Sequence, residues 1–506
     1  MSRFERRLTV MVAEPRLGRA FNLDLHDLTV IRSMSSSLAQ HSASLFAPAI
    51  SVGPGGVQIH DAEALKSEAM DRLVWEVVFG AEPSRQSARG LLWDLGQATG
   101  VRPASIHDLY LACGRGEFGG FTVPAINVRM IAYDTARAAI RAALKGNAGA
   151  IIFEIARSEI AYTDQRPAEY VAVMIAAALR EGYRMPLFIQ GDHCQVNAKK
   201  YADDPEGEVG EVKKLIAEEV GAGFFNVDVD TSTLVDLQQP SLDLQQRTNY
   251  ERAAEITAFI RGIEPRGVTV SVGGEIGEVG MKNSTVEELE AFMGGFTRSL
   301  AGRGPGLAGL SKISVQTGTS HGGVVLPDGS IADVQLDLAA LEALSKAARA
   351  QYGLGGAVQH GASTLPPNAF GNFPRVGAIE IHLATNFQNI VFDHPRLPAD
   401  LARRMKEWLD QNAQSERKPK DTDEQFYYRA RKKAIGPFKQ ELWSLPADVR
   451  TAIAADLEKT FDFLFEQLKV YGTAPVVAKA VRAPALTEDQ LHRTGERAVD
   501  DAEAGE

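Results

Sequence analysis

The stretch Phe121-Thr122-Val123-Pro124-Ala125-Ile126-Asn127-Val128 is an apolar run, and the helical pattern Ala132–Leu144 follows it. Seven more apolar runs come later in the chain: Ala150–Ile155, Pro186–Gln190, Phe224–Val229, Val268–Gly273, Lys312–Thr317, Gly356–Gln359 and Ala378–Ala384. Most gaps between them hold a helix-like segment, which a connection between parallel strands requires. Eight strands alternating with helices predict a (β/α)₈ TIM barrel. A doubly wound open sheet is the alternative, because Leu365-Pro366-Pro367 allows only a short helix in the last gap.

The remainder of the 506 residues divides around this barrel. We expect an N-terminal extension over residues 1–105, largely helical and of unknown role, and the barrel over 106–398. A helical C-terminal segment should cover 399–482, and the polar tail 483–506 is predicted to be disordered. The extension is interpreted as a capping or oligomerisation region.

Composition narrows the class of protein. Hydrophobic residues make up 44% of the chain and charged residues 24%, values typical of a globular protein. No apolar run approaches the roughly 20 residues that span a bilayer, so no membrane association is expected. The net charge of −11 disfavours nucleic acid as a partner. Two cysteines supply neither a disulfide framework nor a metal-binding pair, and we expect a cytoplasmic protein.

Polar side chains stand at the end of every predicted strand. They are Asn127, Glu154, Asp192 with His193, Asp228, Glu275, His321, His360 and His382. In a barrel these positions share the carboxyl-terminal face, where active sites lie. Three imidazoles, from His193, His321 and His360, suit Zn²⁺ or Co²⁺ with one position left open for substrate. The alternative is that each is a hydrogen-bonded histidine at a strand end.

Three carboxylates are candidates for proton transfer or metal contact. Asp192 precedes His193 and is well placed to exchange a proton with a metal-bound substrate; otherwise it is a hydrogen-bond partner or a helix cap. Glu275 and Glu278 lie in the glycine-rich stretch 274–280, where either could contact a metal or act as a base. For Glu278 a solvent-facing loop position is the alternative.

Two glycine-flanked turns, residues 318–323 and 360–363, favour an anion site. Glycine lets backbone N–H groups approach a phosphate closely, and Ser363 adds a hydroxyl donor. The basic residues of 429–433 are either a solvated helix face or a second phosphate clamp.

Four motifs occur in the order found in one family: Gly191-Asp192-His193, Gly274-Glu275-Ile276-Gly277, Gly318-Thr319-Ser320-His321-Gly322 and His360-Gly361-Ala362-Ser363. Residues 105–470 thus resemble the class II, metal-dependent fructose-bisphosphate aldolases. The resemblance implies a (β/α)₈ barrel, a homodimer or homotetramer, and a place in carbohydrate metabolism such as glycolysis. It also implies reversible cleavage of a ketose phosphate through a dihydroxyacetone-phosphate enediolate.

The resemblance assigns roles residue by residue. It implies that His193, His321 and His360 bind zinc, that Glu275 holds the metal in an alternative position, and that Asp192 is the acid/base. The phosphate-binding residues that it implies are Gly322, Gly361, Ser363 and Thr385, with Arg429 or Arg431 reaching the far phosphate. Asn127, Gly323 and Asn386 are predicted as further substrate contacts.

The chain departs from the family in its last strand. His382-Leu383-Ala384-Thr385-Asn386 replaces the usual Asn-x-Asp-Thr-Asp. His382 is predicted to donate a hydrogen bond to the reacting oxygens; the alternatives are a fourth metal ligand or packing. Two other functions remain open: a non-catalytic barrel similar to the partner subunit of tagatose-bisphosphate aldolase, and a metal-dependent barrel hydrolase.

Overall fold

The structure, a computed structural model, describes residues 40, 42–53, 56–277, 282–318, 326, 336–487 and 490–491. Eight parallel strands form its centre: β4 (Val123–Asn127), β5 (Ile152–Ala156), β6 (Leu187–Gln195), β7 (Asn226–Asp230), β8 (Ser271–Glu275), β9 (Lys312–Val315), β10 (Ala357–Gln359) and β11 (Glu380–Leu383). Their order is β6-β5-β4-β11-β10-β9-β8-β7, and β6 also pairs with β7, which closes the sheet. The (β/α)₈ prediction is confirmed, and the open-sheet alternative is wrong.

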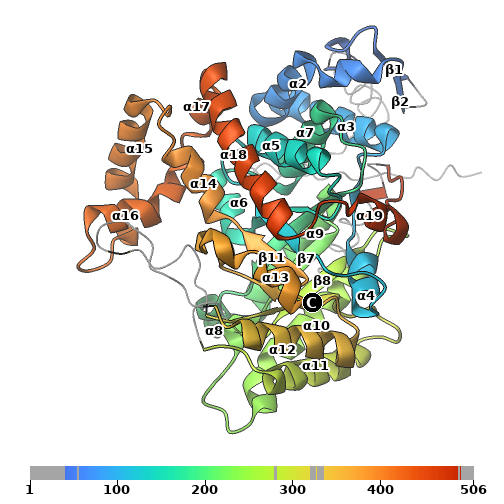
Figure 1. Ribbon diagram of the computed structural model, residues 1–506, viewed down its shortest axis with the longest axis vertical. Coiled ribbons are helices and arrows are strands. Elements are labelled where there is room, and N and C mark those ends of the chain that lie inside the picture. The colour runs from blue at the N-terminus through green and yellow to red at the C-terminus, as the bar shows by residue number, and fades with distance from the viewer. Residues whose placement is uncertain are drawn as a thin grey trace, which may run out of the picture.

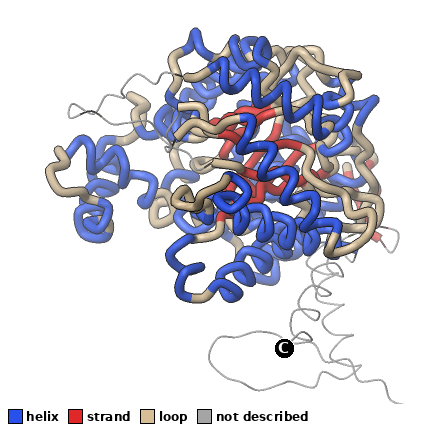
Figure 2. The backbone as a smooth tube through the Cα atoms, turned by 90° about the horizontal axis from the view of Figure 1, so that it is seen from below, coloured by secondary structure: helices blue, strands red, loops and turns tan. Residues whose placement is uncertain are grey.

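Helices surround the strands, as the tube in Figure 2 shows. Between successive strands lie α5 (Ala132–Lys145), α6 (Arg157–Thr163) with α7 (Pro167–Glu181), α8 (Ala198–Asp203) with α9 (Pro205–Ala222), α10 (Leu242–Ile263), α11 (Val286–Ala301) and α12 (Leu338–Tyr352). The last crossover is built only of the short helices η3 (Ala362–Thr364), η4 (Pro367–Ala369) and α13 (Asn372–Val376). Pro366 and Pro367 shorten the helices of this crossover but do not prevent closure of the barrel.

The segment before the barrel contains both helices and strands. A hairpin of β1 (Ile50–Gly53) and β2 (Gly56–Ile59) precedes η1 (Ala62–Lys66), α2 (Glu68–Phe79), α3 (Glu82–Thr99) and α4 (His107–Gly114). The short strand β3 (Pro103–Ala104) pairs with β6 and attaches this segment to the barrel. Helices α2 and α3 pack against α7, so they cover the barrel wall rather than its mouth (Figure 1).

The C-terminal segment wraps back over the barrel. Helices α14 (Thr385–Phe392), α15 (Ala399–Asn412), α16 (Asp423–Ala430) and α17 (Lys439–Trp443) come first, with η5 (Gln414–Glu416) and η6 (Arg431–Ala434) among them. Helix α18 (Ala447–Gln467) then packs along α5, and α19 (Ala474–Ala480) contacts α4 (Figure 1). No helix of the described residues is long and apolar enough to cross a membrane.

The barrel interior is polar where many barrels are filled by branched apolar side chains. The charged and amide side chains buried on its strands include Glu154, Gln190, Asp228, Lys312 and Glu380. Burying such groups is costly unless they are hydrogen-bonded or paired.

Candidate metal centre

His193 owes its position to an irregularity in β6. The pairing of β6 with β7 shifts register between Gly191 and Cys194, which marks a β-bulge. Within it, His193 has φ of 44°, in the left-handed region that costs a non-glycine residue about 1–3 kcal/mol. Bulges re-aim side chains next to active sites. Here the bulge brings both Asp192 and His193 to the lining of the same cavity.

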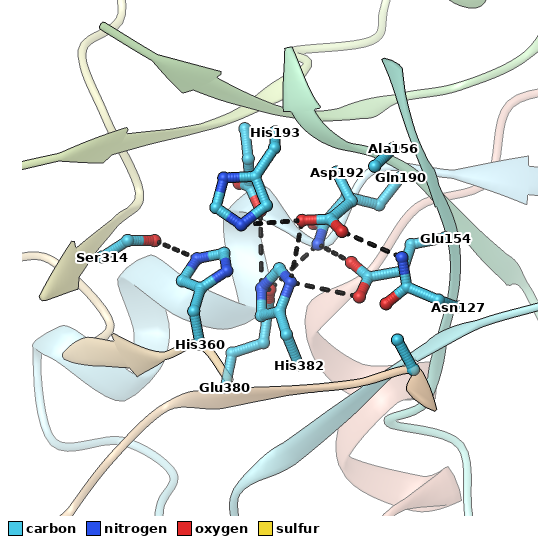
Figure 3. Close-up of polar contacts among 12 residues, drawn as sticks. Asn127, Glu154, Ala156, Gln190, Asp192, His193, Ser314, His360, Glu380 and His382 are labelled. Atoms are coloured by element: carbon cyan, nitrogen blue, oxygen red, sulfur yellow. Dashed lines mark hydrogen bonds and ion pairs between the residues drawn. The ribbon is translucent and has the colours of Figure 1, made fainter. Parts of the chain in front are cut away.

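Three candidate ligands converge at the carboxyl ends of the strands. One donor atom from each of His193, Glu275 and His360 lies within 4.8 Å of the others. The His193 and His360 rings have centroids 4.2 Å apart, and His193 Nδ1 lies 3.4 Å from Glu275 Oε2. His360 Nε2 is also 2.8 Å from Ser314 Oγ (Figure 3). We call this group the upper cluster.

The charge balance of the upper cluster fits a divalent cation. Burial and the nearby Asp230 carboxylate raise the pKa of Glu275 to about 8, although His193 acts in the opposite direction. Burial lowers the pKa of His193, but Asp192 and Glu275 outweigh it and raise that pKa well above its usual value. Carboxylates therefore draw a proton onto His193, and a divalent ion would supply that charge. Imidazole nitrogen and carboxylate oxygen are donors that zinc accepts.

Asp230 supports His193 and was not recognised as a site residue from the sequence. Its Oδ2 lies 3.1 Å from His193 Nδ1, and its Oδ1 accepts hydrogen bonds from the Ser232 backbone and hydroxyl. Carboxylates in this relation to a metal-binding histidine fix its ring orientation and tautomer. Only the position of Asp230 at the end of β7, two residues after Asp228, gave a signal in the sequence.

Four predicted residues lie outside the described part of the chain. His321, Gly322, Gly323 and Glu278 all fall in its gaps, so their assignments stay predictions.

Asp192 is held by two partners at the cavity wall. Its Oδ2 accepts a hydrogen bond of 2.9 Å from Asn127, and its Oδ1 lies 3.1 Å from His382 Nδ1 (Figure 3). Burial acts to raise the pKa of Asp192, but His193 and His382 outweigh burial and hold it well below its usual range. Asp192 is therefore an ionised carboxylate that faces the upper cluster.

His382 has carboxylates on both sides of its ring. Nδ1 lies 3.1 Å from Glu154 Oε1 and from Asp192 Oδ1, while Nε2 lies 2.7 Å from Glu380 Oε1. Its ring centroid is 3.9 Å from that of His360. His382 thus connects the upper cluster to the buried polar interior, and it lines the cavity.

A cavity of about 700 Å³ opens above these residues. Gly361, Ser363 and Thr385, expected at a phosphate, all line it, as does Arg429. Lys432, from the basic stretch 429–433, also lines it, as do three cationic side chains that the sequence did not single out: Arg129, Arg157 and Lys200. Lys432 comes from η6 and lies over the Tyr162 ring, 5.6 Å from its centroid. No ion pair joins Lys432 to any residue that the structure describes.

Two other expected substrate contacts lie elsewhere. Asn386 lines an adjoining cavity of about 520 Å³ rather than the main one. The Arg431 guanidinium donates to Asp393 and Asn389 and lies over Tyr428, outside the lining of the main cavity. Arg429 lines the main cavity but is paired with Asp421.

The fold and the site define a class: (β/α)₈ barrels that carry a candidate metal centre at the carboxyl ends of their strands. The model of the family described as "Fructose-bisphosphate aldolase class-II" matches residues 113–441, and the chain belongs to this family. The resemblance seen in the sequence is therefore confirmed. Family membership supports a lyase-type enzyme. Class II aldolases also typically depend on a divalent metal, and the upper cluster is a possible site for one.

Similar solved structures differ strongly in sequence. A putative fructose-1,6-biphosphate aldolase from Coccidioides immitis is 20% identical, covering 72% of this chain and 96% of its own, with a TM-score of 0.41. A fructose-bisphosphate aldolase from Campylobacter jejuni is 17% identical, covering 74% and 97%, with a TM-score of 0.44. A fructuronate-tagaturonate epimerase from Cohnella laeviribosi is 14% identical, covering 69% and 82%, with a TM-score of 0.48. Likenesses at this level say nothing about activity. None of the curated proteins compared with the chain matches it.

Proposed function

We propose that this protein is a metal-dependent aldolase that cleaves or forms a ketose phosphate, with dihydroxyacetone phosphate as one product. One observation carries the proposal: the ionised Asp192 lies beside the His193–Glu275–His360 cluster, in a cavity lined by several cations. A proton-transfer group, a metal centre and anion-binding groups are the three parts that this reaction needs.

The upper cluster would hold the ion, which we propose to be Zn²⁺ or Co²⁺. When bound, such an ion polarises a carbonyl and stabilises negative charge on oxygen. His193, Glu275 and His360 would supply ligands, and His321 is proposed as a further one. Asp230 would hold His193 in orientation through its Nδ1 contact.

Asp192 would exchange a proton with the substrate hydroxyl at the carbon–carbon bond that breaks. A carboxylate with a low pKa is ionised at neutral pH, as a base in the cleavage direction must be. Asn127 donates to the other carboxylate oxygen, so Oδ1 keeps a fixed direction next to His382. Both ring nitrogens of His382 face carboxylates of the chain, so His382 would donate to the oxygen on which negative charge develops by turning its Nδ1 hydrogen away from Asp192 Oδ1.

The anionic end of the substrate would bind where Gly361, Ser363 and Thr385 meet. The Ser363 oxygen accepts from the Ala384 backbone at 2.6 Å, which leaves its hydrogen available for a phosphate. A second phosphate, where present, would meet Lys432 and Arg129. Burial and the neighbouring Arg129 lower the pKa of Lys432, and an anion there would relieve this repulsion.

A panel of ketose mono- and bisphosphates tests the proposal, with triose phosphate release as the readout. The purified protein should release triose phosphate from at least one member, and the Asp192→Asn variant should lose this activity while it keeps its metal. Lack of release from every member, in protein with full metal content, would refute the aldolase proposal and leave the non-catalytic barrel. Phosphate release in place of triose phosphate would favour the hydrolase. The proposed homodimer or homotetramer is tested separately by light scattering.

A further inference from the structure

A second group of potential ligands lies deeper in the barrel than the upper cluster. Donor atoms of Glu154, Asp228, Glu380 and His382 all lie within 4.8 Å of one another, and all four residues are buried. We call this group the lower cluster. By donor type alone it resembles a metal site, since carboxylate and imidazole groups bind divalent ions.

Lys312 distinguishes the lower cluster from the upper one. Its side chain has no exposed area, and its ammonium contacts three acceptors. Lys312 Nζ lies 2.8 Å from Asp228 Oδ1, 2.5 Å from Glu380 Oε1 and 2.8 Å from the Gln190 side-chain oxygen. An ammonium has three protons to donate, so this one is fully used within the barrel.

Glu380 connects Lys312 to His382, which lines the cavity. Its Oε1 receives Lys312, the Gln190 amide at 2.9 Å and His382 Nε2 at 2.7 Å, and its Oε2 accepts a hydrogen bond from Tyr110. These donors come from α4, β6, β9 and β11, so the carboxylate cannot turn without breaking several contacts. The ring of His382, drawn next to Glu380 in Figure 3, is thereby held at Nε2.

The two clusters also differ in how the negative charge of their carboxylates is balanced. Burial raises the pKa of Glu380, but Lys312 and His382 outweigh it and bring that pKa to about 2. The donors of the upper cluster are His193, Glu275 and His360, with no lysine among them. Positive charge is supplied by the chain in the lower cluster, whereas the upper cluster is short of it.

We propose that Lys312 is a built-in cation that occupies the lower cluster in place of a second metal ion and, through Glu380, positions His382 at the base of the cavity. The catalytic consequence rests on the proposed function. The occupancy of the lower cluster by Lys312 is independent of the proposed function, because it follows from contacts within the barrel. Lys312 and Glu380 are positioning residues here, since His382 lies between them and the cavity.

Zinc titration of Lys312→Met tests the occupancy. Methionine keeps most of the volume and removes the charge, so the folded variant should bind one equivalent of Zn²⁺ per chain more than the unaltered protein. Lys439→Met is the matched control, because Lys439 is also buried and paired with a carboxylate, that of Glu169, yet contacts no residue of the lower cluster. Folded Lys312→Met with an unchanged zinc count would overturn the proposal.

A double variant keeps the test decisive if Lys312→Met does not fold, since removing one partner of a buried pair leaves an uncompensated charge. Lys312→Met with Glu380→Gln removes both charges at once. Its zinc count should equal that of the unaltered protein. The imidazole N–H resonances of His382, identified by their absence in His382→Asn, should shift or disappear.

The double variant should also lower kcat about 10- to 100-fold, the usual effect of losing a group that orients an active-site residue, with little change in KM. Unchanged His382 resonances together with unchanged kcat would show that Lys312 and Glu380 have no positioning role. If no ketose phosphate is turned over by the unaltered protein, the proposed function fails. The zinc count and the resonances still decide this inference.

Discussion

Replacing Asp230 by Asn tests the support of the candidate metal centre without altering a ligand. Asp230 Oδ2 lies 3.1 Å from His193 Nδ1, while Oδ1 accepts from the Ser232 backbone and hydroxyl. Asparagine keeps the shape and can keep the Ser232 contacts, so the change falls on Oδ2, which faces His193 and also accepts a hydrogen bond from the Gln195 amide. Such partners of metal-binding histidines are worth about 10- to 100-fold in metal affinity, or roughly 1.4–2.7 kcal/mol.

Competition with a chromophoric chelator measures this affinity for Zn²⁺ directly. The Kd of Asp230→Asn should rise about 10- to 100-fold, with the circular dichroism spectrum unchanged. Asp236→Asn is the control, because Asp236 is exposed six residues further on and contacts neither His193 nor Glu275. An unchanged Kd in Asp230→Asn would refute the assignment of His193 as a ligand held by Asp230.

Four further predictions follow from the same contacts. Asp192→Asn should reduce kcat about 100-fold or more while metal content stays constant, as steady-state kinetics with metal analysis will show. Ser363→Ala should raise KM for a phosphorylated ketose about 10- to 100-fold, and equal turnover of phosphorylated and unphosphorylated ketoses would contradict this role. His382→Asn should change substrate preference across the ketose phosphate panel, whereas an unchanged profile would assign His382 to packing. Burial raises the pKa of Glu219 to about 8, so the native state retains a proton that the unfolded state releases. Stability should therefore fall as pH rises from about 4.5 to 8, and Glu219→Gln should make that fall less steep in urea unfolding.

The barrel could be predicted because its strands are buried on both faces. The sequence of such a strand is a continuous apolar run, whereas the helices between the strands repeat their apolar residues with a helical period. Phe121–Val128 and the later apolar runs therefore mark the strands to within a few residues. The residues at the mouth of the barrel could then be predicted as well, because the carboxyl ends of parallel strands meet at one face. His193, His360, Asp192 and His382 do come together there.

The interior network could not be predicted in the same way. Lys312 and Glu380 stand at the beginnings of β9 and β11, where a charged residue is ordinarily solvent-facing, and nothing local indicates that they meet. The positive φ of His193 depends on the register of β6 against β7, which the sequence does not state. Lys432 reaches the cavity from η6, and its approach to Tyr162 spans 270 residues of chain.

Metal analysis of the purified protein measures whether the upper cluster binds an ion. We expect one zinc-class ion per chain in the unaltered protein and little or none in His193→Ala and His360→Ala, with both variants folded. Full metal content in either variant would contradict the assignment of that histidine as a ligand. Full content in both would place the metal outside the upper cluster.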